Sequence, residues 1–296
     1  MKTYVITGSI GHISKIIVEG LVKAGHDVRV ITSSPDRVKD IEKLGARPLV
    51  GKVQDLSFVK GAFEGTDAVY TMIPPLWQTN NWRASQNEIG KNYAEAIQAN
   101  NIRYVVNLSS IGADKGNAVG PVDGLADFEK MLNGIKGINV KHLRPSYFFN
   151  NFLSQIGLIK QAGIMGANYG ESEKLFLVHP RDIASVALDE LLRLNFKGIS
   201  VRYIFGDERF GSEVANVLGN AIGKDLKWVV FSDDEQLKGM LQAGVPEENA
   251  RQYTTMGKAL REGYMQEDAR KHMPALSQTK LEDFASEFAA AFRSMN

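Results

Sequence analysis

Residues 4–14 read Tyr-Val-Ile-Thr-Gly-Ser-Ile-Gly-His-Ile-Ser and set the fold of the first half of the chain. The first four residues form a short apolar and β-branched run, which is typical of a buried strand. Two glycines follow at Gly8 and Gly11, and apolar residues from Ile13 onward recur at helical spacing. The order of strand, glycine-rich turn and helix predicts a βαβ unit whose first turn approaches a phosphate group.

Each position in this turn has a physical task. Gly8 lets the chain turn sharply, and Gly11, which lacks a Cβ atom, lets the backbone approach a phosphate closely. The following helix points free N–H groups and its positive dipole end at the same place. Ser14 is small enough for the close packing of helix on strand. The alternative is a tight turn without a ligand. The candidate pyrophosphate-binding residues are Gly8, Ser9, Ile10, Gly11, His12 (through its backbone N–H) and Ile13.

Apolar runs and amphipathic stretches alternate beyond this turn. Their steps of roughly 20–30 residues are typical of a parallel sheet with helices on both faces. The runs at residues 68–73 and 103–108 are almost continuously apolar, as strands buried on both faces are. The pattern therefore predicts an α/β fold with a doubly wound parallel sheet, the Rossmann arrangement. The expected strands are residues 4–7, 27–32, 46–50, 68–73, 103–108 and 139–143.

The second half is less regular and mainly helical. We expect a dinucleotide-binding domain over residues 1–150 and a smaller substrate-side portion over residues 151–296, of which residues 175–206 return to the first sheet. Further strands are predicted at residues 176–178, 201–205 and 227–231, and helices at 182–194, 212–222, 233–243, 247–261 and 279–292.

Composition excludes several classes of function. The 296 residues include 35 Lys and Arg against 34 Asp and Glu, a balance that argues against a nucleic-acid partner. Cysteine is absent, which excludes disulfides, thiol nucleophiles and cysteine-ligated metals. No two histidines share a helical spacing, so no metal site is predicted. No apolar run approaches the ~18 residues of a membrane span, and no basic and apolar leader opens the chain, so we expect a cytoplasmic protein.

The residues after the second predicted strand bear on the choice of cofactor. An acid at this strand tip usually binds the ribose of NAD, but none stands there. Instead, the hydroxyls of Ser33 and Ser34 and the guanidinium of Arg37 suit a 2′-phosphate. NADP(H) is therefore favoured over NAD(H). The alternative is that Arg37 is a solvated residue in the first turn of a helix.

Parallel sheets place their ligands at the carboxyl ends of their strands. Met72 and Ile73, after the fourth strand, are candidates for cofactor contact on this ground. Ser109, after the fifth, can hydrogen-bond a substrate carbonyl or the nicotinamide ribose, or its hydroxyl is satisfied by the backbone. Trp77 and Trp82 either stack on a flat acceptor or anchor a long loop.

Four stretches together carry a family resemblance. Residues 107–113 read Asn-Leu-Ser-Ser-Ile-Gly-Ala, residues 142–151 read His-Leu-Arg-Pro-Ser-Tyr-Phe-Phe-Asn-Asn, and residues 178–184 read Val-His-Pro-Arg-Asp-Ile-Ala. With the glycine turn, their order and spacing resemble the NmrA-like branch of the atypical short-chain dehydrogenases. This branch includes proteins of the quinone oxidoreductase and triphenylmethane reductase type. The resemblance extends over nearly the whole chain.

The resemblance implies a doubly wound sheet that binds NAD(P)(H), with a smaller C-terminal portion over the substrate. Some members reduce quinones or dyes with NADPH, whereas others sense the cofactor and bind a protein partner. Members often carry Arg where Ser33 stands and an acid where Val53 stands, near the adenine; here Gln54 can bond the adenine edge instead. Among the aromatic residues that follow Pro145, Tyr147 is expected to face the reactive end of the cofactor.

Ordinary short-chain dehydrogenases and sugar-nucleotide epimerases need Tyr-x-x-x-Lys on the helix after the fifth strand. Leu125 and Glu129 occupy these positions here, so a sugar-nucleotide epimerase is the least favoured function and no catalytic residue is assigned. Hydride transfer to an electron-poor acceptor needs little acid chemistry from the protein. The leading hypothesis is therefore an NADPH-dependent reductase of a flat acceptor such as a quinone. The alternative is a catalytically silent NADP(H) redox sensor that binds a protein partner.

Overall fold

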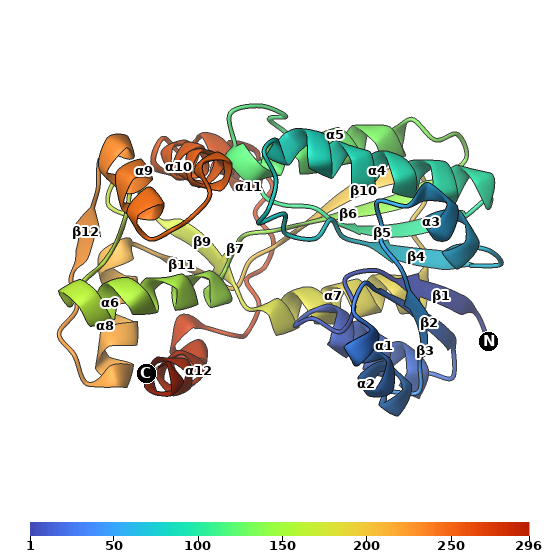
Figure 1. Ribbon diagram of the computed structural model, residues 1–296, viewed down its shortest axis with the longest axis horizontal. Helices are drawn as coiled ribbons and strands as arrows, with labels where there is room; N and C mark the ends of the chain where they lie inside the picture. The colour runs from blue at the N-terminus through green and yellow to red at the C-terminus, as the bar shows by residue number, and fades with distance from the viewer. Residues whose placement is uncertain (296) are drawn as a thin grey trace. The chain divides into compact units, whose positions relative to one another are not determined.

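A parallel sheet of seven strands, in the order β10-β6-β5-β4-β1-β2-β3, combines six strands from the N-terminal half of the chain with β10 (Figure 1). The computed structural model describes residues 1–295. The chain winds outward from β1 to β3 and then, from β4 onward, in the opposite direction, which confirms the predicted doubly wound α/β class. The strands are β1 (Thr3–Ile6), β2 (Asp27–Thr32), β3 (Arg47–Val50), β4 (Ala68–Thr71), β5 (Tyr104–Leu108), β6 (Asn139–Pro145) and β10 (Ile199–Ile204).

Helices cover both faces of this sheet (Figure 1). In β1, Val5 joins the apolar core on one face, whereas the adjacent Tyr4 faces the other way and donates its hydroxyl to Leu191 O at 3.0 Å. This two-residue alternation leaves both faces in need of cover. One face carries α3 (Leu56–Ala62), α4 (Trp82–Ala99) and α5 (Asp123–Asn133), and the other carries α1 (Ser14–Lys23), α2 (Val38–Lys43) and α7 (Pro180–Arg193).

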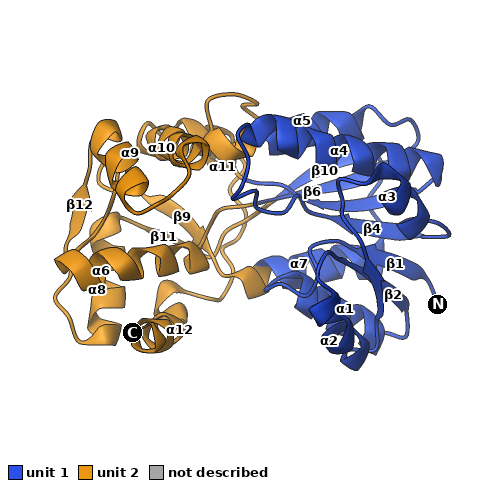
Figure 2. Ribbon diagram, viewed as in Figure 1, with its two compact units in different colours: residues 1–110, 124–144, 183–202 blue, residues 111–123, 145–182, 203–296 orange. Residues whose placement is uncertain are grey.

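The chain forms two compact units, each discontinuous in sequence (Figure 2). The first unit comprises residues 1–110, 124–144 and 183–202. The second comprises residues 111–123, 145–182 and the chain from 203 onward. Residues 145–150, expected with the dinucleotide-binding part, therefore lie in the second unit, and α7 returns to the first.

The second unit is mainly helical, with two small sheets of order β11-β9-β7 and β12-β8. Of residues 175–206, which were expected to return to the first sheet, only β10 joins it, because β9 pairs with β7 and β11 instead. The strands are β7 (Tyr147–Phe148), β8 (Met165–Ala167), β9 (Leu175–Val178), β11 (Asp207–Arg209) and β12 (Trp228–Val230). The helices are α6 (Ile156–Ala162), α8 (Gly211–Ile222), α9 (Asp233–Gln242), α10 (Glu247–Arg261), α11 (Glu267–Lys271) and α12 (Leu281–Ser294).

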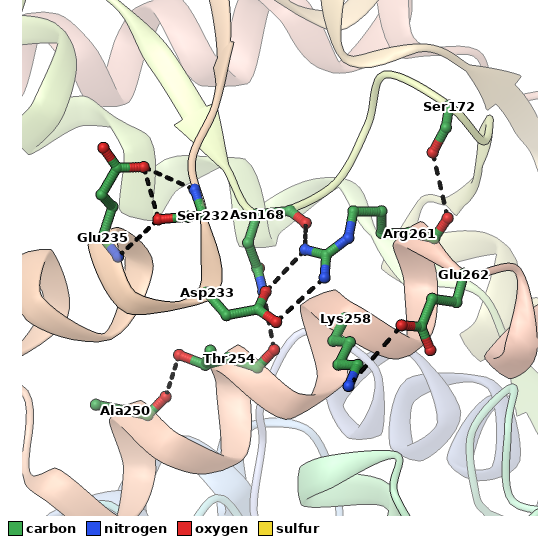
Figure 3. Close-up of polar contacts among 10 residues, drawn as sticks. All are labelled: Asn168, Ser172, Ser232, Asp233, Glu235, Ala250, Thr254, Lys258, Arg261 and Glu262. Atoms are coloured by element: carbon green, nitrogen blue, oxygen red, sulfur yellow. Dashed lines mark hydrogen bonds and ion pairs between the residues drawn. The ribbon is translucent and has the colours of Figure 1, made fainter.

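A charged cluster fastens α9 and α10 in the second unit (Figure 3). Arg261, which ends α10, donates to both carboxylate oxygens of Asp233 at 2.7 and 3.1 Å and to Asn168 O at 2.6 Å. Asn168 Nδ2 donates in turn to Asp233 at 2.8 Å and to Thr254 O at 2.9 Å. The bond from Arg261 holds the pKa of Asp233 below its usual range. The cluster therefore ties three separate segments together at one point.

None of the helices within residues 1–295 combines the length and the apolar character that a crossing of the bilayer requires.

Candidate cofactor-binding site

The glycine turn, residues 7–14, joins β1 to α1 in a strained conformation. Gly8 has φ +84° and Ser9 has φ +56°, so two successive residues adopt the left-handed conformation. For a residue other than glycine this costs about 1–2 kcal/mol. Ser9 is held there by β2, because its N–H donates to Ile31 O at 3.1 Å and its Oγ donates to Thr32 Oγ1 at 3.1 Å. The end of β2 thus fixes the shape of the turn.

The two glycines of the turn have different surroundings. A Cβ atom on Gly8 would lie 2.9 Å from Met72 Sδ and 3.1 Å from Ser14 Oγ, so the fold itself requires this glycine. A Cβ atom on Gly11 would meet only Gly8 O, at an ordinary contact distance of 3.5 Å. The space beside Gly11 is therefore open to a ligand, as close approach of a phosphate to the backbone requires.

The start of α1 offers unpaired donors. Within residues 1–295, the backbone N–H groups of Ile10, His12 and Ile13 donate no hydrogen bond to another residue. The helix has no side-chain cap and no acid in its first turn. Uncapped amides and an uncompensated dipole end favour an anion. The turn therefore fits a pyrophosphate group held by main-chain amides, which is the arrangement that the spacing predicted.

The end of β2 presents hydroxyls and a cation. Thr32 Oγ1 accepts from Ser34 N–H at 3.2 Å and donates to Ser34 O at 3.3 Å, which orders the chain after the strand. Ser33 and Arg37 are exposed there, and Ser34 is half-buried. Arg37 forms no ion pair with any part of the described chain. An unpaired guanidinium beside hydroxyls is a suitable receptor for a phosphate monoester.

The loops after β3 and β4 carry the other candidate cofactor contacts of the first unit, Gln54, Met72 and Ile73. Asn92 on α4 donates to the backbone carbonyls of Val53 at 3.1 Å and Gln54 at 2.8 Å and so fixes the backbone that carries the exposed Gln54 side chain. Met72 lies against the glycine turn, where its N–H donates to Thr7 Oγ1 at 2.8 Å. The side chain of Ile73 packs into the apolar core, so only its backbone is available to a ligand.

Ser109 follows β5 at the carboxyl edge of the sheet. Its N–H donates to Leu143 O at 2.8 Å, whereas its Oγ, in a residue only 4% exposed, lies near the Glu129 carboxylate and helps to lower the pKa of that carboxylate without forming a hydrogen bond of standard geometry. Buried hydroxyls are usually fully hydrogen-bonded, and this one is not. A ribose hydroxyl or a carbonyl oxygen of a ligand would satisfy it. The alternative in which the backbone accepts from this hydroxyl is not what the structure shows.

Sequence reasoning missed a row of polar side chains across the buried sheet. Thr71 Oγ1 donates to Asn107 Oδ1 at 3.0 Å, Asn107 Nδ2 donates to His142 Nδ1 at 3.1 Å, and His142 Nε2 donates to Asn133 Oδ1 at 2.8 Å. The first three occupy matching positions on β4, β5 and β6. Polar residues at matching positions of otherwise apolar strands are the signal that could have identified them. Burial lowers the pKa of His142 to about 4, so the ring is neutral.

Glu129 stands where the Tyr-x-x-x-Lys pattern would place its lysine, and it forms a buried ion pair that sequence reasoning also missed. Glu129 on α5 is 4% exposed and Arg144 on β6 is 8% exposed. Arg144 donates through Nε at 3.0 Å and through a terminal nitrogen at 2.6 Å, a bidentate arrangement. Burial alone would raise the pKa of Glu129, but Arg144, together with His142 and Ser109, outweighs burial, so the pKa of Glu129 is lowered. Leu125 packs against the core. No proton-transfer pair exists at these two positions.

Tyr147 belongs to β7 in the second unit. Its hydroxyl accepts from the hydroxyl of Tyr169 at 3.0 Å, and its ring lies 5.3 Å from that of Phe152 between centroids. Burial raises the pKa of Tyr147 well above its usual value and that of Tyr169 to about 12, so both phenols stay protonated at neutral pH. The glycine turn lies in the first unit, and the expected contact of Tyr147 with the cofactor stays a prediction.

Comparison with known proteins supports this assignment of the turn. Residues 8–147 match the model of a family described as NAD(P)H-binding. The chain is 24% identical over 223 residues to the (4-alkanoyl-5-oxo-2,5-dihydrofuran-3-yl)methyl phosphate reductase of Streptomyces griseus, with 75% of each chain covered. It is 21% identical over 242 residues to the NAD(P)H azoreductase of Xenophilus azovorans, with 82% of each chain covered.

Solved structures show the same fold over almost the full length. The NADPH-dependent quinone oxidoreductase of Escherichia coli, in complex with NADPH, matches with a TM-score of 0.82 at 18% identity, over 96% of this chain and 99% of the other. The triphenylmethane reductase of Citrobacter sp., in complex with NADP(H), matches with a TM-score of 0.80 at 17% identity, over 97% and 99%.

Residues 8–147 thus combine a match to an NAD(P)H-binding family with a parallel sheet of the Rossmann type. The chain as a whole shares the fold of the quinone oxidoreductase and the triphenylmethane reductase, the two types of protein named in the resemblance drawn from its motifs.

Proposed function

We propose that the protein is an NADPH-dependent reductase that transfers a hydride to a flat, electron-poor acceptor such as a quinone. The observation that carries the proposal is the turn at Gly11, where free main-chain amides meet an open space at an uncapped helix start. The named relatives support the class of reaction, because their names describe reduction of quinones, dyes and an azo compound with nicotinamide cofactors.

The residues of the first unit divide the binding task. The amides of Ile10, His12 and Ile13 would hold the pyrophosphate, as at other uncapped helix starts. Arg37, with Ser33 and Ser34, would hold the 2′-phosphate, which favours NADP(H) over NAD(H). The hydroxyl of Ser109, which forms no hydrogen bond of standard geometry within the described chain, would bond the nicotinamide ribose or the acceptor carbonyl. These contacts position the cofactor, which supplies the hydride when bound.

Protons need not come from the protein. An electron-poor acceptor takes up a hydride readily, and water then supplies the proton that completes its reduction. Glu129, at the lysine position of Tyr-x-x-x-Lys, is paired with Arg144 and cannot act with a tyrosine in proton transfer. This pairing is compatible with hydride transfer that needs no protein acid, and it argues against an epimerase that uses the Tyr-Lys pair. Because a protein without turnover needs no proton-transfer pair, the Glu129–Arg144 pair also favours a second candidate. This candidate is a redox sensor that binds NADP(H) without turnover and changes its affinity for a protein partner.

Two measurements test the proposal. Nicotinamide fluorescence should show that NADPH binds, and binds more tightly than NADH. With NADPH present, a panel of quinones, azo dyes and triphenylmethane dyes should then reveal turnover as loss of NADPH absorbance. Binding without turnover on every acceptor would contradict the reductase and favour the sensor. Absence of binding by either nucleotide would contradict both.

A further inference from the structure

The loop after β4 and the start of α4 carry two tryptophans in opposite environments. Trp82, the first residue of α4, is 3% exposed, whereas Trp77 is 52% exposed. The two rings meet edge to face, with centroids 6.2 Å apart and planes at 87°. One exposed apolar side chain is ordinary on a protein surface. Trp77 differs from other exposed apolar side chains in its position in the fold and in its contact with the buried Trp82 ring.

The position of Trp77 follows from the start of its loop. Met72 begins the loop against the glycine turn, since its N–H donates to Thr7 Oγ1 at 2.8 Å and its Sδ would lie 2.9 Å from a Cβ on Gly8. Trp77 follows within a span of at most about 18 Å of chain, on the carboxyl side of a central strand. Ligands of doubly wound sheets bind on this side.

The loop is fastened at its far end. Thr79 Oγ1 lies 2.7 Å from Ser85 Oγ and donates to Asn81 O at 3.1 Å. Asn81 caps α4 through its side chain, which accepts from Ala84 N–H at 3.0 Å. Because the loop is attached to the helix that also holds Trp82, the exposed indole occupies a defined place. A preorganised surface loses little entropy when a ligand binds to it.

The helix that supports the loop is itself fixed. Arg83, one residue beyond Trp82, donates to both carboxylate oxygens of Asp127 on α5 at 2.7 and 2.8 Å. Gly124 lies so close to Gln86 that no Cβ fits between α4 and α5. Trp82 therefore forms a rigid base for the Trp77 ring.

We propose that the exposed face of Trp77 is the stacking surface for the acceptor and that it selects acceptors by the area of their flat ring system. This inference rests on the proposed reductase function and identifies the residue that recognises its substrate. An indole is rich in π electrons and stacks well, in an offset arrangement, on flat rings. Residues 71–82 include no charged side chain, so the surface selects by shape and not by charge. Uncharged quinones of two or more fused rings are the expected substrates.

Binding of a quinone to the protein loaded with NADP⁺ tests this without turnover, because the oxidised cofactor has no hydride to give. Isothermal titration with 1,4-naphthoquinone and with 9,10-phenanthrenequinone should give a tighter Kd for the larger ring system. Trp77→Ala should raise both values by about fivefold to tenfold, the usual strength of an aromatic pair. Trp77→Phe, which keeps a flat face, should change them by less than about threefold.

Leu192→Ala is the matched control. Leu192 lies on α7 of the same unit and is 41% exposed, so its removal deletes a comparable apolar surface elsewhere. It should leave quinone binding unchanged, and all variants should bind NADP⁺ as the parent protein does. Equal quinone affinity in parent and Trp77→Ala would overturn the inference, and so would a parent protein that binds neither quinone. Naphthoquinone bound through Trp77 without any turnover would support the inference while refuting the reductase function.

Discussion

Gly8 and Gly11 differ in what a side chain at each position would touch. Gly11→Leu adds a side chain where only Gly8 O lies near, so the free energy of unfolding should change by less than about 1 kcal/mol. The same side chain fills the space that a phosphate needs, so NADPH binding should weaken by at least about a hundredfold. Nicotinamide fluorescence and urea unfolding measure the two effects.

Gly8→Ala is the matched variant for this test. It places a Cβ at φ +84° and within 3 Å of Met72, so it should lower the free energy of unfolding by about 1–3 kcal/mol. We therefore expect Gly11→Leu to stay folded but to lose NADPH binding, and Gly8→Ala to be less stable than the parent protein. Unimpaired NADPH binding by Gly11→Leu would show that the pyrophosphate binds elsewhere.

At the scale of single residues, Arg37 also tests the expected preference for NADPH over NADH. Its guanidinium is exposed and unpaired within the described chain, so Arg37→Ala should leave stability nearly unchanged. Loss of a charge-assisted bond to a phosphate should weaken NADPH binding about tenfold and leave NADH binding within about twofold. Titrations of both nucleotides give the ratio. If both affinities fall together, Arg37 does not contact the 2′-phosphate.

At the scale of elements, α5 is joined to β6 by the buried Glu129–Arg144 pair. Glu129→Gln leaves a buried guanidinium without its counter-charge and should lower the free energy of unfolding by about 3–5 kcal/mol. The double variant Glu129→Leu with Arg144→Met should be more stable than Glu129→Gln, because no uncompensated charge remains. Denaturant unfolding of the three proteins checks the order. A double variant less stable than the single one would mean that the pair stabilises the fold beyond charge balance.

His142, in the row of polar side chains across β4, β5 and β6, should make the free energy of unfolding depend on pH. Burial lowers its pKa from 6.5 to about 4 in the folded protein, whereas the unfolded chain takes up a proton near pH 6.5. Between these values the unfolded state binds more protons, so stability falls as the pH falls. The loss should approach about 3 kcal/mol at pH 4. His142→Gln should flatten this part of the pH profile of unfolding, and an unchanged slope would assign the loss to other groups.

At the scale of the whole molecule, cofactor binding should stabilise the chain by mass action. NADPH at a hundred times its Kd contributes about 2.7 kcal/mol if it binds only the folded protein. The thermal midpoint should therefore rise by several degrees with NADPH and less with NADH at equal concentration. Gly11→Leu should show no rise, which separates specific binding from a general effect of the nucleotide. A rise of equal size in that variant would place the stabilising site away from the glycine turn.

Both units are discontinuous, which bears on how the chain can be divided. Residues 111–123 and 145–182 leave the first unit, and residues 124–144 and 183–202 return to it. No single cut separates the two units, so the predicted boundary at residue 150 describes sequence order and not a separable fragment.

The class of the fold and the location of the glycine turn were readable from sequence. Both depend on interactions that are local along the chain: the two-residue period of β1, the helical period of α1 and the glycine spacing between them. The same locality explains why most helices lie within a few residues of their expected bounds. The small strands β7, β8 and β11 were missed because runs of two or three residues carry no period.

The tertiary structure alone decided the rest of the site. The Glu129–Arg144 pair and the row from Thr71 to His142 join residues far apart in sequence, and only the packing of β4, β5, β6 and α5 brings them together. Likewise, only a packed α4 shows that Trp82 is buried and that Trp77 is left exposed upon it. Sequence determines what repeats along the chain, whereas burial and pairing between distant residues arise from how the elements pack.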